Sequence, residues 1–316
     1  MAGIIPPGRA VVGMQLPIQS QSTIYREAWE ASAGPAELAA IAQAADRNGF
    51  FYVAVCDHVA IPRPLDETMG TEWWDTIATL GWLAGITEHV RLLSHVSVLP
   101  YRHPLITAKA FSTLDVLSGG RAVLGVGAGH VEAEFALLGA DYAQRGPQLD
   151  EAIDAVRACF ADEFPAVDGT TWSFADAGQR PRPVQAGGPP IWVGGSSGPA
   201  MRRAADRGDG WLPQGPPKQG MPAAIAALRE RRAAAGKGDE PFDIGINCAP
   251  IYLGEPPFEV PEWTITGSAE RVAGALRKHA ATGANQLQLR FRSRSADELV
   301  DQIETFGATV APLLQD

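Results

Sequence analysis

Two apolar runs enclose one amphipathic run within residues 91–130, and this pattern leaves few folds open to the chain. Val90 to Leu99 is rich in β-branched and apolar residues, and Ala122 to Val126 is a second short apolar run. Between them, apolar residues recur at three-residue steps from Leu105 to Leu114, until Gly119-Gly120 ends the pattern. Two buried strands joined by a helix form a βαβ unit, which is almost always parallel and right-handed within one sheet.

The same alternation of apolar strand and amphipathic helix recurs along the rest of the chain. We count eight strands, each followed by a helix, from Ala10–Leu16 to Leu287–Phe291. Eight such units predict one (β/α)8 barrel domain over residues 1–316. A doubly wound open sheet is the alternative, but the first strand-to-helix loop lacks the G-x-G-x-x-G pattern. Two segments interrupt the alternation: an inserted hairpin and crossing loop at about 164–190, and a proline-rich loop at about 250–262.

The composition narrows the classes of partner. With 316 residues, 46% hydrophobic and 20% charged, the chain can bury a large core. A net charge of −10 without a dense Lys/Arg cluster disfavours nucleic acid and anionic membrane surfaces. Cys56, Cys159 and Cys248 have none of the spacings typical of zinc sites or disulfide frameworks. Because no export signal is visible either, we expect a cytoplasmic protein.

Polar and glycine-rich segments follow several of the predicted strands. In a (β/α)8 barrel the carboxyl ends of all strands meet at one mouth, where the chemistry takes place. We therefore expect one site built from the segments Gln15, Asp57-His58, Tyr101-Arg102-His103, Gly127-Ala128-Gly129-His130, Gly194-Gly195-Ser196-Ser197-Gly198, and Arg290, Arg292 and Arg294. The last three residues would make the mouth locally positive, which implies an anionic cofactor or substrate.

The segment Gly194 to Gly198 has two interpretations. Its glycines would let the backbone approach a phosphate closely, while free amides at the start of the next helix point at the anion. The same residues also fit an ordinary turn in which Ser197 caps that helix. The motif alone does not decide between a phosphate site and a turn.

Three histidines are candidates for chemistry. His58 could act as an acid or base because imidazole titrates near neutral pH, although a loop histidine bonded to a backbone carbonyl is the commoner case. His95 lies in an apolar run, where we expect a buried neutral histidine, and His103 fits a role in ordering its loop. We expect no metal centre, because no cluster has metal-ligand spacing.

Several segments read together resemble the bacterial luciferase-like family over nearly the whole chain: VAVCDHV, VLPYRHPLITAKAFSTLDVLSGGRAVLGVGAG, RPRPVQ with PPIWVGG, and RRAADRGDGW. Their order is similar to that in the family's flavin monooxygenases and, more closely, in its oxidoreductases that use the deazaflavin coenzyme F420. The ending QLQLRFRSRSADELVDQIE also resembles the second group. The resemblance implies a cofactor ring in the barrel mouth, against a bulge with a non-proline cis peptide at His95-Val96, and a phosphate near Gly194 to Gly198.

The resemblance also implies roles for individual residues. His58 would be the base near the reacting carbon, Asp57 would orient it, and His130 would be the acid. The cofactor would be bound by Asp57, His95, Val96, Gly127, Ala128, Gly129, Gly194, Gly195, Ser196, Ser197 and Gly198. The family's sugar-phosphate dehydrogenases have tryptophan at the position of Ile61 and glutamate at that of His130, which weakens the case for glucose 6-phosphate as the substrate.

We therefore expect an oxidoreductase that moves hydride between coenzyme F420 and a small organic substrate, with the cofactor supplying the electronics. An FMN-dependent monooxygenase of the same family is the alternative. A flavin- or ligand-binding barrel without catalysis is a second alternative, because a fold does not imply a function. We also expect a homodimer.

Overall fold

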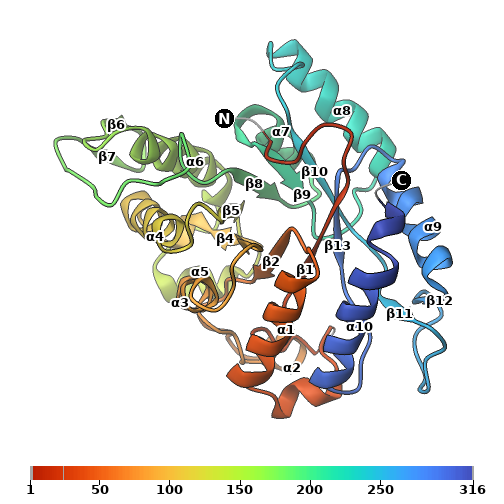
Figure 1. Cartoon of the computed structure of the whole chain (residues 1–316). Coiled ribbons are helices and arrows are strands. Elements are labelled where there is room, and N and C mark those ends of the chain that lie inside the picture. The colour runs from red at the N-terminus through yellow and green to blue at the C-terminus, as the bar shows by residue number, and fades with distance from the viewer. Residues whose placement is uncertain (1–2, 24, 315–316) are drawn as a thin grey trace.

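The strands of the computed structural model, which describes residues 3–23 and 25–314, form a closed ring of parallel strands surrounded by helices (Figure 1). Hydrogen bonding follows the order β3-β2-β1-β13-β10-β9-β8-β5-β4, and a β3–β5 pairing closes the ring. The predicted (β/α)8 barrel is confirmed, with β3 and β4 as two halves of the third strand. The strands are β1 (Val11–Gln15), β2 (Tyr52–Val55), β3 (Arg91–Ser94), β4 (Ser97–Val98), β5 (Ala122–Gly127), β8 (Ile191–Gly194), β9 (Gly210–Leu212), β10 (Asp243–Asn247) and β13 (Gln286–Leu289).

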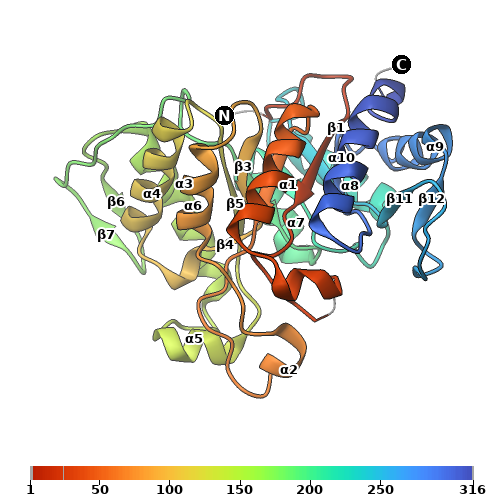
Figure 2. The same cartoon turned by 60° about the horizontal axis from the view of Figure 1, so that its bottom comes forward.

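Helices cover the outside of the barrel. They are α1 (Pro35–Arg47), α3 (Thr76–Ala84), α4 (Pro104–Leu117), α6 (Arg145–Ala161), α7 (Gly198–Arg207), α8 (Met221–Ala234), α9 (Ala269–Ala280) and α10 (Ala296–Thr309). Serine hydroxyls cap α7, α9 and α10. Two further short helices, α2 (Asp66–Met69) and α5 (Glu132–Leu138), project together from one end of the barrel (Figure 2). Short 3-10 turns are η1 (Ala28–Ser32), η2 (Leu99–Tyr101) and η3 (Pro312–Leu314).

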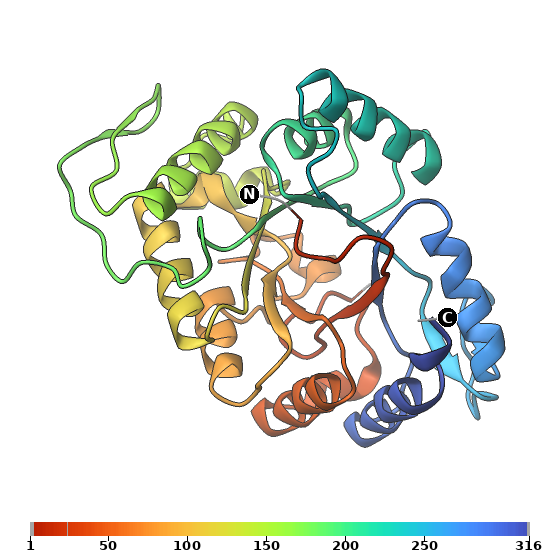
Figure 3. The ribbon, with the colours of Figure 1, turned by 45° about the horizontal axis from the view of Figure 1, so that its top comes forward.

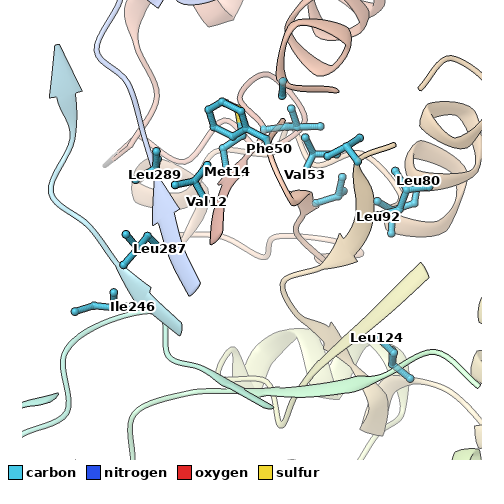
Figure 4. Close-up of a cluster of buried hydrophobic side chains, with 14 of the residues drawn as sticks. Val12, Met14, Phe50, Val53, Leu80, Leu92, Leu124, Ile246, Leu287 and Leu289 are labelled. Atoms are coloured by element: carbon cyan, nitrogen blue, oxygen red, sulfur yellow. The ribbon is translucent and has the colours of Figure 1, made fainter. Parts of the chain in front are cut away.

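Alternate residues of each strand face outward and pack against the helices (Figure 4). Met14 and Leu289 lie beside Phe50 in this layer, and Leu92 lies beside Leu80. All five side chains are buried. Burial of one such side chain contributes about 1.5–3 kcal/mol, so this layer dominates the stability of the barrel.

The remaining strand residues face the interior, where glycines make room for large side chains. A Cβ on Gly13 would overlap the Tyr52 ring, and a Cβ on Gly210 would lie 2.5 Å from the Trp192 ring. The Tyr52 hydroxyl reaches Gln288 Oε1 at 3.1 Å across the barrel. The interior around these glycines is therefore filled by a few large residues.

The N-terminal segment closes the end of the barrel opposite α2 and α5 (Figure 3). Ile5 is buried in the interior cluster, and the backbone amides of Ile4 and Ile5 donate to the Asp243 carboxylate at 2.8 and 3.1 Å. Trp192 Nε1 donates to the same carboxylate at 3.1 Å. Burial raises the pKa of Asp243 to about 6, although these hydrogen bonds oppose the shift.

Two insertions leave the barrel. Strands β6 (Val167–Asp168) and β7 (Ser173–Phe174) form an antiparallel hairpin beside α4 and α6 (Figure 1). The segment at 250–262, expected to be a loop, contains strand β11 (Ile251–Leu253), which pairs in parallel with β12 (Ile265–Gly267). The loop expectation is wrong there because Leu253 is buried against α10 and its amide donates to Gln302 Oε1 at 2.7 Å.

Candidate active site

The third strand is interrupted at the barrel mouth by a bulge. Its residues His95 and Val96 are joined by a cis peptide bond, as the family resemblance implied. Ser94 bridges the interruption, since its hydroxyl donates to Gly125 O at 2.9 Å and accepts from Gly125 N at 3.0 Å. The Val96 side chain occupies the space that a Cβ on Gly127 or Gly194 would take. Both glycines therefore admit the bulge into the interior, a reason that the sequence did not reveal.

Two hydrogen-bond acceptors near this bulge have no protein partner. His95 is buried, and Nε2 lies 3.3 Å from Leu212 O. Burial lowers the pKa of His95 to about 4, so the ring is neutral near pH 7, as expected. If Nε2 donates to Leu212, then Nδ1 is an acceptor, and it is buried without a partner among the described residues. Asn247 Oδ1, at the carboxyl end of β10, is also a buried acceptor without a partner among the described residues.

His58 and His130 meet at the mouth, as we expected from their positions after β2 and β5. Their ring centroids are 5.8 Å apart, and the Trp73 ring lies 4.4 Å from His58 on another side. The His58 side chain is only 11% exposed. Burial, and then the neighbouring His58, lower the pKa of His130, which favours the neutral form of its ring.

The carboxylate that orients His58 belongs to Glu134 of α5. His58 Nδ1 lies 2.8 Å from Glu134 Oε2, and the Tyr101 hydroxyl donates to the same oxygen at 2.9 Å. The backbone amides of Val59 and Ala60 donate to Oε1 at 2.6 and 3.1 Å. Burial alone would raise the pKa of Glu134, but these hydrogen bonds outweigh it and the pKa is lowered.

Our expectation that Asp57 orients His58 is wrong. The Asp57 carboxylate is paired with Arg102, at 2.6 and 2.7 Å, and accepts from the Val98 amide at 2.9 Å. These contacts fix the end of β2 against β4 and the turn that follows it. Asp57 is buried, and both of its oxygens are used within the protein. Asp57 therefore contributes to the site by fixing the backbone next to His58 against β4 and the turn that follows it.

The segment Gly194 to Gly198 caps α7 and still leaves donors free. Ser197 Oγ accepts from the Ala200 amide at 3.3 Å, as the turn interpretation predicts. Among hydrogen bonds between described residues, the amides of Ser196, Ser197 and Gly198 have no acceptor. Arg202 Nη1 lies 3.5 Å from the point where a Gly198 Cβ would sit, so a cation accompanies these amides.

Two of the three arginines after β13 are paired with carboxylates, so they add little positive charge to the mouth, contrary to our expectation. Arg292 pairs with Glu27 at 2.7 Å, and Arg294 pairs with Glu298 at 2.8 Å. Arg290 lies over the Tyr25 ring at 4.8 Å and donates to the Tyr25 carbonyl at 2.7 Å. These residues hold mouth loops in place. Their partners come from distant segments, which the local sequence could not reveal.

Within residues 3–23 and 25–314, no group of three or more His, Cys, Asp or Glu side chains is arranged to hold a metal ion. No helix in these ranges is long and apolar enough to cross a membrane.

His103 caps α4 by accepting from the Leu105 amide at 3.2 Å, so it orders its loop as expected.

Comparisons with known proteins agree with this architecture. The chain is 37% identical over 199 residues to an F420-dependent glucose-6-phosphate dehydrogenase of Beutenbergia cavernae, which covers 60% of this chain and 56% of that protein. A monooxygenase structure from Streptomyces bottropensis superposes with a TM-score of 0.76 at 22% identity, over 96% of this chain and 99% of that one. A coenzyme F420-dependent tetrahydromethanopterin reductase from Methanopyrus kandleri gives 0.76 at 19%, with 96% and 99% covered. At these identities the two structures show the fold alone.

The family model described as luciferase-like monooxygenase matches residues 11–308, which is nearly the whole barrel. That range includes the bulge, the histidine pair and the loop that caps α7. The chain therefore belongs to the luciferase-like monooxygenase family, whose members are oxidoreductases or monooxygenases.

Proposed function

We propose that this protein is an oxidoreductase that transfers hydride between coenzyme F420 and a small organic substrate. The observation that carries the proposal is the pair His58 and His130, held at the barrel mouth beside the bulge at His95-Val96. Transfer of hydride to or from a substrate requires a protein group that handles the accompanying proton. An imidazole held by a carboxylate is suited to that task near neutral pH.

The residues at the mouth fit a planar cofactor that carries a phosphate. His95 Nδ1 and Asn247 Oδ1 are buried acceptors without partners among the described residues, which suits a ring that presents N–H groups. The amides of Ser196, Ser197 and Gly198, which have no acceptor within the described part of the chain, suit a phosphate with Arg202 beside them. These residues would hold the cofactor, and Gly127 and Gly194 would admit the bulge that supports it.

The chain's own residues would handle position and protons. When bound, the deazaflavin supplies the carbon that accepts or donates hydride. In the oxidative direction, the imidazole of His58 takes the substrate proton that is released as the hydride leaves. His130 lies next to His58, with its pKa lowered by burial, and would pass a proton to or from it. Trp73 and the Glu134 network pack around His58 and leave its side chain only 11% exposed, which strengthens electrostatic contacts there.

An FMN-dependent monooxygenase is the second candidate. It is favoured by the description of the matching family model and by the monooxygenase structure that superposes over 96% of the chain. The F420 proposal is supported by the 37% sequence identity to an F420-dependent relative, which is higher than the 22% identity to the monooxygenase structure. It is also supported by the paired histidines. That relative acts on glucose 6-phosphate by name. This chain instead carries Ile61 and His130 at the positions where the family's sugar-phosphate dehydrogenases have tryptophan and glutamate.

Separate fluorescence titrations with F420 and FMN test the proposal. We expect tighter binding of F420, and about tenfold weaker binding in Arg202→Ala because one charge-assisted contact to the phosphate is lost. Arg207→Ala is the matched control, since Arg207 lies on the same helix but pairs with Asp154 at 3.1 Å. Tighter FMN binding would favour the monooxygenase, and cofactor binding without any turnover in a substrate screen would favour the non-catalytic barrel.

A further inference from the structure

We infer that Glu134 is a positioning residue that fixes the tautomer of His58, keeping the proton on Nδ1 and leaving Nε2 as the proton acceptor. The catalytic meaning of this inference depends on the proposed function. The tautomer itself is a property of the free protein and can be measured without cofactor. The inference can therefore fail while the proposed function stands, or the reverse.

The Glu134 carboxylate is surrounded by hydrogen-bond donors. Four donors approach its two oxygens: His58 Nδ1 and the Tyr101 hydroxyl at Oε2, and the amides of Val59 and Ala60 at Oε1. Glu134 is 0% exposed. An ionised carboxylate only accepts hydrogen bonds, so each of the four partners must donate. His58 Nδ1 therefore carries a proton in both the neutral and the cationic ring.

No other group near His58 and Glu134, among the described residues, hydrogen-bonds to His58 Nδ1 and could set its tautomer. Tyr101 already donates to Glu134, and burial followed by the charge of Glu134 raises the pKa of its hydroxyl, so it stays protonated. His130 presents its ring edge-on to His58 at a centroid distance of 5.8 Å, and Trp73 does so at 4.4 Å. Asp57 and Arg102 are engaged with each other. Glu134 alone contacts Nδ1 among the described residues.

Glu134 also links the two segments that project from the mouth. Oε1 holds the loop that leads from β2 towards α2, and the residue itself belongs to α5 (Figure 2). One side chain thus fixes both the loop that carries His58 and the protonation state of its ring. Oε1 alone would be enough to hold the loop. The contacts of Oε2 therefore belong to the second role, which is to set the protonation of the His58 ring.

Glu134→Gln tests the inference with an isosteric change. The Gln oxygen can keep the two backbone amides, which leaves its NH₂ facing His58 and makes Nδ1 an acceptor. Nitrogen NMR of the free protein, at a pH high enough for a neutral ring and with His58→Ala to identify the signal, should show the Nδ1–H tautomer in the wild type and Nε2–H in the variant. An Nε2–H tautomer in the wild type would overturn the inference, even if the variant fails to fold.

Turnover gives a second readout. We expect Glu134→Gln to lower kcat by about 10²–10⁴-fold, the range for losing a correctly held general base, with cofactor affinity little changed. Adding His58→Ala should then cause little further loss, because both changes disable one unit. Glu151→Gln is the matched control, since Glu151 also accepts backbone amides, from Thr171 and Trp172 at 2.9 and 2.6 Å, away from the mouth. If the losses of kcat in Glu134→Gln and His58→Ala were additive, Glu134 would be only a structural clamp. The same would follow if Glu134→Gln and Glu151→Gln lowered kcat equally.

Discussion

Asp57 and Arg102 form a two-pronged salt bridge, with oxygen–nitrogen distances of 2.6 and 2.7 Å, that joins the end of β2 to the turn after β4. The Asp57 side chain is 3% exposed and that of Arg102 is 29% exposed. Removal of one partner from a buried pair typically costs about 3–5 kcal/mol, and the low end applies to loss of Asp57 because the Arg102 charge left behind is partly exposed.

Asp57→Asn should therefore lower the free energy of unfolding by about 3 kcal/mol. Denaturant unfolding measures this loss. Glu304→Gln is the control, because it breaks the exposed Arg47–Glu304 pair and should change stability by less than about 1 kcal/mol. Equal effects of the two substitutions would mean that the Asp57 pair does not hold the mouth together.

His58→Ala should lower turnover by about 10²–10⁴-fold, since general acid–base assistance is lost, while cofactor affinity changes far less. His130→Ala should have the smaller effect, because it faces His58 without a carboxylate of its own. Steady-state kinetics over a pH series decide this, and near-full hydride transfer by His58→Ala would make the histidine structural.

Gly127→Ala should be destabilising by about 1–3 kcal/mol, since its Cβ would overlap a Val96 methyl group in a closely packed interior. Val96→Ala removes that methyl group. The double variant should consequently lose less stability than the sum of the two single variants, as a double-mutant cycle of unfolding free energies would show. Strict additivity would indicate that the bulge does not occupy the space left by Gly127.

The buried Asp243 makes stability depend on pH. Burial raises its pKa to about 6 from the usual 3.8, so between these values the folded state binds more protons than the unfolded state. The free energy of unfolding must then fall as pH rises through that window, by about 3 kcal/mol from this group. The difference in stability between wild type and Asp243→Asn should shrink by this amount between about pH 4 and about pH 7. A difference that stays constant would contradict the raised pKa.

The barrel and the meeting of His58 with His130 could be predicted because both follow from strand periodicity. Residues after parallel strands share one mouth, whatever their separation in sequence. Glu134 could not be predicted in the same way. It is one of two acidic residues in the first turn of α5, and only the orientation of that short helix turns it, rather than Glu132, towards His58.

Partners that are distant in sequence account for the other errors. Asp57 stands next to His58 in the chain, yet its partner Arg102 lies 45 positions away. Arg292 and Arg294 look like free cations in the sequence, but they meet Glu27 and Glu298 in the fold. Strand β11 is too short for its period to separate it from a proline-rich loop.

Anaerobic turnover with a single added cofactor tests the central claim most directly. If the protein transfers hydride between F420 and its substrate, either reduction of F420 or oxidation of its reduced form should proceed without oxygen, and FMN should not replace it. A protein that turns over only with FMN and oxygen, and leaves both forms of F420 unchanged under anaerobic conditions, is not an F420-dependent oxidoreductase.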